Sequence, residues 1–190
     1  MSTAQKNMKK FITQIEFKED FRCFKKGRII EFREGINFIV GDQGTGKSTL
    51  LQCLTERFGT TVQITCDKDS EFMYFDTEKN NPRVKSEADS MFTINSIFES
   101  HGETMFPILS HMKKIKDKVM LIDEPESGLS IRSICELIKV FKFAEAKNNC
   151  QLIIATHNIQ LIECVVDVYS LEHDKWMDGE LEFIPSQGQN

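Results

Sequence analysis

The segment that most constrains this chain is a glycine-rich turn between an apolar run and an amphipathic stretch. The apolar run Ile36–Val40 is followed by Gly-Asp-Gln-Gly-Thr-Gly-Lys-Ser-Thr at positions 41–49. This segment fits the pattern G-x-x-x-x-G-K-[ST], which requires a strand before it and a helix after it. Its glycines let backbone N–H groups curl around phosphate oxygens, and the helix N-terminus adds positive potential there. The sequence therefore predicts a phosphate-binding loop.

The residue types in this loop predict separate tasks. We expect Lys47 to reach the β- and γ-phosphates of a nucleoside triphosphate and Ser48 to offer its hydroxyl to Mg²⁺. The predicted nucleotide-binding residues of the loop are Asp42, Gln43, Gly44, Thr45, Gly46, Lys47, Ser48 and Thr49.

A second motif ends another apolar run. The residues Val119–Ile122 precede Asp123, Glu124 and Pro125. Asp123, at the strand tip, is placed to hold the Mg²⁺ shell through water, and Glu124 to orient and polarise an attacking water. An ordinary acidic turn would look the same in isolation. Its pairing with the phosphate-binding loop favours a Walker B strand.

A third motif is the run Leu152–Ala155 followed by Thr156 and His157. In a doubly wound sheet this strand would lie beside the Walker B strand, with its carboxyl end at the ligand-binding edge. The imidazole of His157 could then contact the γ-phosphate or hold the water. The alternative is a histidine with a structural role only.

The remaining pattern predicts the fold class. Continuous apolar strands alternate with amphipathic helices, which indicates an α/β protein with a mostly parallel sheet covered on both faces. The first 35 or so residues alternate apolar and polar positions and predict an antiparallel β flank. We expect helices over 47–58, 130–147 and 159–165, further strands over 62–66 and 72–75, and a closing hairpin of 168–171 and 181–184 around Asp178-Gly179.

The chain of 190 residues is long enough for one domain, and we expect a single domain over 1–190. Within it, residues 76–92 predict a polar loop, and residues 93–117 predict a reduced helical region with helices over 93–98 and from 103 toward 116. The net charge of −5 disfavours a globally basic nucleic-acid binder. Two local groups of basic residues, at 25–28 and 113–118, could meet nucleic acid or form a solvated surface.

Cysteine usage and hydropathy bear on location. The six cysteines include no C-x-x-C pair, which disfavours a zinc ribbon or a redox dithiol. We expect reduced, mostly buried thiols. No apolar run approaches the ~20 residues that span a bilayer. The sequence predicts a cytoplasmic protein without membrane insertion.

Taken together, the motifs resemble an ABC-type ATPase. The resemblance rests on the loop ending Gly-Lys-Ser-Thr, the Asp-Glu-Pro tripeptide, the segment Ser-Gly-Leu-Ser at 127–130 and the Ile-Ile-Ala-Thr-His strand, and it spans about residues 11–171. It leans to the soluble branch that includes SMC proteins, double-strand-break repair ATPases and small predicted ATPases of bacteria and phages. It implies a P-loop NTPase fold that binds ATP and Mg²⁺, with Glu124 and His157 as catalytic residues.

The resemblance also implies contacts that motif spacing alone does not. Ser100 and Gly102, in Ser-His-Gly-Glu, match the serine and second glycine of the family's signature segment, which contacts the nucleotide of the opposite subunit in a head-to-tail homodimer. A helix N-cap is the alternative, and the two roles are compatible. Arg22 could touch phosphate or stack on adenine. Phe21 and Phe24 are other candidates for stacking, or all three are sheet residues.

The implied function is ATP-driven dimerisation that acts on a partner in DNA repair, maintenance or defence, such as a separate nuclease. A transporter nucleotide-binding subunit is the first alternative. The absence of a Gln after 72–75, where Asp76-Thr77-Glu78 stands, the short helical region and the signature segment speak against it. Ser130 stands where transporters carry Asp, a difference that bears on the coupling between subunits. A non-hydrolytic nucleotide sensor is the second alternative, and Glu124 speaks against it.

Overall fold

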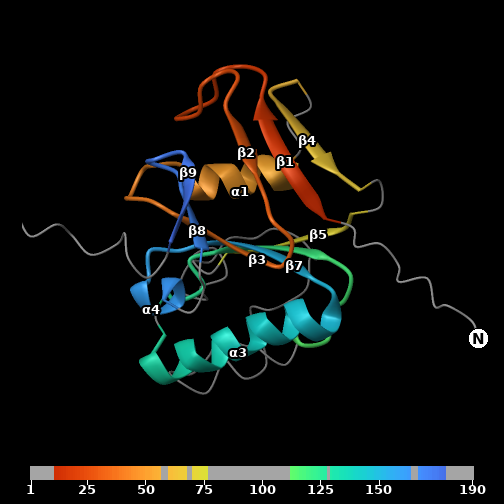
Figure 1. The fold of residues 1–190 in the computed structure, drawn as a ribbon, viewed down its shortest axis with the longest axis vertical. Coiled ribbons are helices and arrows are strands. Elements are labelled where there is room, and N and C mark those ends of the chain that lie inside the picture. The colour runs from red at the N-terminus through yellow and green to blue at the C-terminus, as the bar shows by residue number, and fades with distance from the viewer. Residues whose placement is uncertain are drawn as a thin grey trace, which may run out of the picture.

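The computed structural model describes residues 11–56, 60–67, 70–76, 112–127, 129–163 and 167–178 (Figure 1). Its strands are β1 (Ile12–Phe17), β2 (Ile29–Glu31), β3 (Ile36–Val40), β4 (Val62–Cys66), β5 (Phe72–Asp76), β6 (Val119–Asp123), β7 (Gln151–Ala155), β8 (Asp167–Ser170) and β9 (Lys175–Asp178). Its helices are α1 (Lys47–Glu56), α3 (Ile131–Asn148) and α4 (Ile159–Ile162).

A six-stranded sheet forms the centre of the fold. Its order is β5-β6-β7-β3-β8-β9, and every pair is parallel except β8 with β9. The strand before the phosphate-binding loop, β3, is therefore separated from β6 by β7. In register, Asp123 of β6 lies beside Asp76 of β5 and Ala155 of β7. The strands that carry the predicted site thus end at one edge of the sheet.

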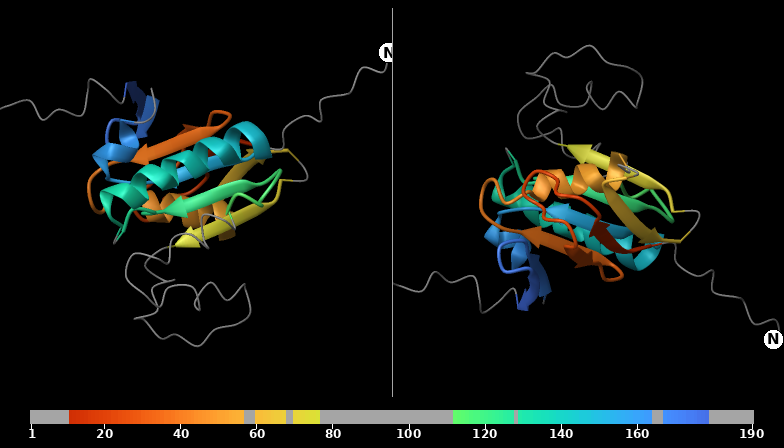
Figure 2. Two further views of the ribbon diagram at one scale, coloured as in Figure 1. Left: turned by 90° about the horizontal axis from the view of Figure 1, so that it is seen from below. Right: turned by 90° about the horizontal axis from the view of Figure 1, so that it is seen from above.

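A second, three-stranded sheet has the order β2-β1-β4 and is antiparallel. The predicted antiparallel flank is confirmed, and β4 joins it from later in the chain. Helix α1 lies between the two sheets, and α3 covers the opposite face of the six-stranded sheet (Figures 1 and 2). The molecule is thus layered as sheet, helix, sheet and helix.

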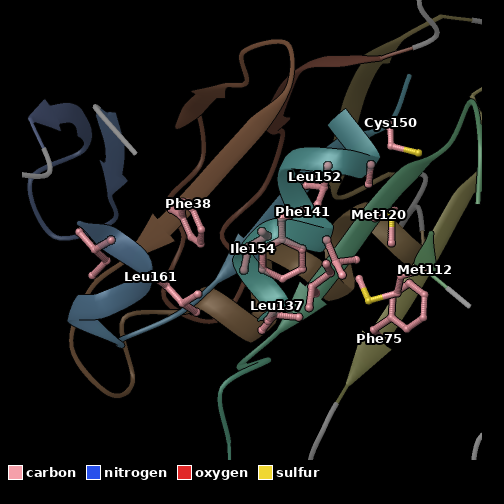
Figure 3. Close-up of a cluster of buried hydrophobic side chains, with 14 of the residues drawn as sticks. Phe38, Phe75, Met112, Met120, Leu137, Phe141, Cys150, Leu152, Ile154 and Leu161 are labelled. Atoms are coloured by element: carbon pink, nitrogen blue, oxygen red, sulfur yellow. The ribbon is translucent and has the colours of Figure 1, made fainter. Parts of the chain in front are cut away.

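The central strands are buried on both faces, and their alternation divides the core into two clusters. In β6, Met120 and Ile122 pack in the cluster that includes α3, whereas Val119 and Leu121 pack in the cluster that includes α1. Figure 3 shows the α3 side, where Phe141 lies against the sheet. Because side chains alternate along a strand, Asp123 continues the row of Val119 and Leu121 and falls on the α1 side of the sheet.

Helix α3 has a capping residue at each end. The side chain of Ser130, at the N-cap, accepts a hydrogen bond from the backbone N–H of Ser133. Asn149 follows the last helical residue with φ of 53°, in the left-handed region that ends many helices. The predicted helix over 130–147 is confirmed within one residue at each end.

A buried glutamine ties the two sheets together. The Gln151 side chain accepts a hydrogen bond from the Ile12 N–H at 2.8 Å and donates to the carbonyl oxygens of Ile12 and Arg33, both at 2.8 Å. Gln151 is fully buried at the start of β7. Strand β1 of the antiparallel sheet is thus fixed to β7, the strand that precedes His157.

The closing hairpin differs from the prediction. Its turn lies at 171–174, and β9 is Lys175–Asp178, so Asp178 is in a strand rather than at the turn. Asp174 takes a φ of 53°, which a short polar side chain tolerates in a tight turn, and accepts a hydrogen bond from the Tyr169 hydroxyl. Met177 is buried opposite Val168. The predicted strand over 181–184 lies outside the described residues.

The helical region before β6 is described only from Met112. Met112 is helical, Lys113 and Lys114 form a turn, and 115–118 is not helical, so the expected helix does not extend to Lys116. Ile115 is buried, which pins this segment to the core. The rest of the expected helix from 103, the helix over 93–98 and the polar loop after Asp76 lie outside the described residues.

The cysteines and hydropathy add two findings. Cys53 and Cys150 are buried, and burial raises the pKa of the Cys53 thiol to about 11. Cys23 and Cys135 are exposed, so the expectation of mostly buried thiols is wrong for these two. Within the described ranges, no helix combines the length and apolar character that crossing a membrane requires.

Replacement of Gln151 by Leu should destabilise the fold. The substitution leaves the N–H and C=O of Ile12 and the C=O of Arg33 buried without their partner, which should lower the free energy of unfolding by about 2–4 kcal/mol. Urea denaturation measures the loss. Gln63→Leu, an exposed glutamine on β4, is the control and should change stability little. Equal stability of the two variants would contradict the role of Gln151.

Candidate functional site

A cavity of about 930 Å³ opens at the carboxyl edge of the central strands. It is bordered by the turn after β3 and the start of α1, by the ends of β6 and β7, and by the loop after β1. The lining residues are Arg22, Cys23, Gly41, Asp42, Gln43, Gly44, Gly46, Lys47, Ser48, Thr49, Gln52, Asp123, Glu124 and His157. Of the predicted site residues in the described part of the chain, all but Thr45 line it.

The loop holds its lysine inward. Lys47 is only 7% exposed, and its Nζ donates to the carbonyl oxygens of Gly41 at 2.7 Å and Asp42 at 3.1 Å. Thr45 braces the same turn, because its hydroxyl donates to the Asp42 carbonyl oxygen at 2.8 Å. The ammonium group is therefore centred within the curl of the loop, where a phosphate would meet it.

Gly46 marks a close approach between this loop and the N-terminal segment. It has a φ of 102°, and a Cβ there would lie 2.2 Å from Cys23 Sγ and 3.1 Å from the Phe24 ring. Phe24 is itself fully buried and stacks on Phe17 at 4.3 Å between ring centroids. The shape of the loop thus depends on a hydrophobic contact outside the motif.

Arg22 comes to the cavity from the same segment. Its Nη1 donates to Thr49 Oγ1 and Gln52 Oε1, both at 3.2 Å, and its backbone φ of 52° turns the side chain toward α1. Phe24, the alternative stacking residue, is in the core, and Phe21 is half-buried outside the cavity lining. Arg22 is the one of these three residues that borders the cavity.

Asp123 and Glu124 leave β6 in different directions. Asp123 is 7% exposed, and its Oδ2 accepts a hydrogen bond from the Tyr74 hydroxyl at 3.2 Å. Glu124 has a φ of 44°, and its N–H donates to the Ala155 carbonyl oxygen at 2.9 Å. A left-handed backbone is unusual for a non-glycine residue and is favoured at sites where the chain must aim a side chain.

The side chain of His157 lies near two glutamates that follow β6. Its Nδ1 lies 3.4 Å from Glu124 Oε1 and 3.8 Å from Glu126 Oε1. The His157 side chain is 66% exposed, whereas that of Glu126 is 5% exposed. The parallel pairing of β6 and β7 therefore brings together both predicted catalytic residues, which are 33 positions apart in the sequence.

Sequence reasoning missed four residues of this region. They contact the predicted residues but belong to no phosphate-loop or Walker pattern. These four residues are Gln52, Cys23, Tyr74 and Glu126. The helical spacing of Thr49 and Gln52, three apart, could have identified Gln52. The predicted Ser100 and Gly102, as well as Thr77 and Glu78, lie outside the described residues, and of Asp76 only the backbone is described.

The donor set fits a triphosphate and Mg²⁺. Lys47, Arg22 and the backbone N–H groups of the loop offer positive charge and hydrogen-bond donors to phosphate. The Ser48 hydroxyl and the Asp123 carboxylate offer the oxygen ligands that Mg²⁺ prefers. The described part of the chain contains no group of three or more His, Cys, Asp or Glu that could cage a metal.

Comparisons with known proteins identify the family. A model of the AAA domain family matches residues 19–177. A protein of Pyrococcus horikoshii described as an ABC transporter ATP-binding protein is 24% identical to this chain over an alignment 221 residues long. The alignment covers 90% of this chain and 83% of the relative.

Solved structures resemble the fold. The cassette cbiO1 of Clostridium perfringens, part of the ABC transporter complex cbiONQ, has a TM-score of 0.54 at 16% identity and is covered to 85%, as is this chain. The ATP-binding cassette MJ0796, a dimer in a post-hydrolysis state with ADP and Pi, has a TM-score of 0.57 at 12% identity over 90% of this chain and 98% of that one. The predicted fold is confirmed, and ATP with Mg²⁺ agrees with the matched family.

Replacement of Gly46 by Ala should disrupt the loop. The added methyl group collides with Cys23 and Phe24, which should weaken nucleotide affinity at least tenfold and cost about 1–3 kcal/mol of stability. Titration calorimetry with ATP and thermal unfolding measure the two effects. Gly27→Ala is the control, since Gly27 also has a positive φ, of 84°, but nothing within 4 Å of a Cβ. Unchanged affinity in Gly46→Ala would show that the loop does not depend on this contact.

Proposed function

Because this chain belongs to the AAA domain family, we propose that it is an ABC-type ATPase that binds ATP with Mg²⁺ and hydrolyses it to ADP and phosphate. The observation that carries the proposal is the meeting of Lys47, Asp123, Glu124 and His157 around one cavity. A phosphate-binding loop alone would support the binding of ATP but not its hydrolysis. The two carboxylates and the imidazole at the same edge add the means to activate water.

Binding is assigned to the loop and its surroundings. Lys47 contacts the terminal phosphates, backbone N–H groups of 42–49 cradle them, and Arg22 adds a second cation beside Thr49. Ser48 and Asp123 hold Mg²⁺, which when bound neutralises phosphate charge. The hydroxyl of Tyr74 fixes the orientation of Asp123.

Hydrolysis is assigned to the residues after β6 and β7. Glu124, whose side chain is 30% exposed and lines the cavity, orients a water molecule and accepts its proton as the water attacks the γ-phosphorus. His157 Nδ1 lies 3.4 Å from this carboxylate, and the imidazole contacts the γ-phosphate or the water. The bond to the β-phosphate oxygen breaks, and ADP and inorganic phosphate leave.

Replacement of Glu124 by Gln should separate binding from hydrolysis. The amide has nearly the size of the carboxylate but cannot accept the proton, so steady-state phosphate release should fall at least a hundredfold while ATP affinity stays within about threefold. Lys47→Ala should instead lose ATP affinity, and Lys116→Ala, an exposed lysine, should match the wild type. Wild-type turnover in Glu124→Gln would overturn the assignment of the base.

The active form is proposed to be a head-to-tail homodimer with two nucleotides between the subunits. Ser100 and Gly102 would close the nucleotide that is held by the loop of the opposite copy. ATP then contributes binding energy to both subunits and favours the dimer, and hydrolysis releases it. The whole chain, 1–190, would act as one domain, and two copies would form a clamp that closes on ATP binding and opens after hydrolysis.

Replacement of Ser100 by Arg tests the contact between subunits. The bulky cation should block closure over the partner's nucleotide, so ATP still binds to the isolated subunit while turnover falls at least tenfold. Calorimetry and phosphate release measure these two quantities. Mixing Ser100→Arg with Lys47→Ala should restore part of the turnover, because one of the two sites then combines an intact loop with an intact signature segment. No restoration in the mixture would contradict the head-to-tail arrangement.

The work of the clamp is proposed to lie in DNA repair, maintenance or defence, in the cytoplasm, with a separate effector such as a nuclease. The resemblance to the soluble SMC-like branch supports this. A transporter subunit is the second candidate, favoured by the description of the Pyrococcus horikoshii relative. Affinity capture with Glu124→Gln and ATP distinguishes the two: a nuclease or DNA supports the first, and a membrane protein supports the second.

A further inference from the structure

Glu126 is a buried carboxylate that no motif explains. Its side chain is 5% exposed, and its Oε1 accepts hydrogen bonds from the Thr156 hydroxyl at 2.5 Å and the His157 N–H at 3.2 Å. Its Oε2 is buried with no hydrogen-bond partner in the described part of the chain. Glu126 therefore joins the segment after β6 to the segment after β7.

The hydrogen bonds of Thr156 show which atom donates to Glu126. The Thr156 hydroxyl accepts a hydrogen bond from the Asn158 N–H at 3.0 Å, so its own hydrogen is available for Glu126. Asn158 in turn caps α4, because its side chain accepts from the Leu161 N–H at 3.3 Å. The backbone on both sides of His157 is thus held by one chain of hydrogen bonds that begins at Glu126.

The hydrogen bonds that Glu126 accepts do not by themselves require a negatively charged side chain. A glutamine could accept the same hydrogen bonds without burying a charge, which is costly when one oxygen is left without a donor. A neutral side chain would therefore serve a merely structural role better. We therefore looked for a nearby group whose protonation form the charge of Glu126 would influence.

His157 is the group placed to respond. Its Nδ1 lies within ion-pair distance of two carboxylates, Glu124 at 3.4 Å and Glu126 at 3.8 Å. Ionised carboxylates only accept hydrogen bonds, so they favour the imidazole form that carries a proton on Nδ1. In that form Nε2 carries no proton and can accept a hydrogen bond.

We propose that Glu126 is a positioning residue for His157: its buried carboxylate fixes the backbone of His157 and selects the imidazole form with the proton on Nδ1. The inference rests on the proposed ATPase function for its catalytic consequence. Its structural consequence is measurable without ATP.

Nitrogen NMR of histidine-labelled protein, at about pH 8 and without nucleotide, tests the imidazole form directly. A His157→Gln variant identifies the His157 signals. The wild type should show the proton on Nδ1, and Glu126→Gln should shift the population toward a proton on Nε2, the form usual in free imidazole side chains. Glu136→Gln, at a half-exposed glutamate on α3, should match the wild type. A mainly Nε2-protonated His157 in the wild type would overturn the proposal.

A double-mutant cycle tests the catalytic consequence. Glu126→Gln should lower kcat about tenfold with KM for ATP unchanged, as for other residues that orient a functional imidazole. In a His157→Ala background the same substitution should cause no further loss, because the group through which Glu126 acts is gone. An equal loss in both backgrounds would show a merely structural role and overturn the proposal.

Two further variants cover the case in which Glu126→Gln does not fold. Thr156→Val removes the hydroxyl that orients Glu126 and should move both the NMR signals and kcat, whereas Thr156→Ser keeps the hydroxyl and should move neither. Unchanged NMR signals and kcat in Thr156→Val would overturn the proposal. If the wild type hydrolyses no ATP, the proposed function fails while the NMR result still decides the role of Glu126.

Discussion

The parallel register of β3, β7 and β6 is the constraint on which the site depends. Because these strands run in one direction and are buried on both faces, their carboxyl ends meet at one edge and cannot slip without exposing a row of apolar side chains. The pairing of Asp123 with Ala155 then sets the Walker B segment and His157 side by side. A slip of one residue would carry Asp123 to the α3 side of the sheet, away from the phosphate-binding loop.

The second sheet contributes a less obvious constraint. Phe24, stacked on Phe17, and Cys23 leave room only for a glycine at position 46, while Gln151 fixes β1 to the first residue of β7. The antiparallel flank therefore contacts the phosphate-binding loop at one end and the histidine strand at the other. This explains why a small β flank matters to a site whose motifs all lie in the central sheet.

The sequence was sufficient for features that depend on local pattern. The loop at 41–49, the buried strands and the helix after Ser130 all follow from glycine spacing, continuous apolar runs and capping. Features that depend on contacts across the fold were missed. Nothing in the local pattern shows that β4 pairs with β1, that Tyr74 reaches Asp123, or that Phe24 lies in the core while Arg22 borders the cavity. The closing hairpin was misplaced because Asp178-Gly179 resembles a turn, whereas the buried Met177 requires its neighbours to pair with β8.

The distribution of the three carboxylates after β6 shows how one short segment serves different tasks. Asp123, Glu124 and Glu126 would repel one another if their side chains shared one environment. Strand alternation sends Asp123 to the α1 side and the hydroxyl of Tyr74, and the left-handed backbone of Glu124 turns that carboxylate to the cavity. Glu126 is instead buried against Thr156. Asp123 and Glu126 therefore accept hydrogen bonds from different hydroxyl groups, and Glu124 and Glu126 both lie near Nδ1 of His157.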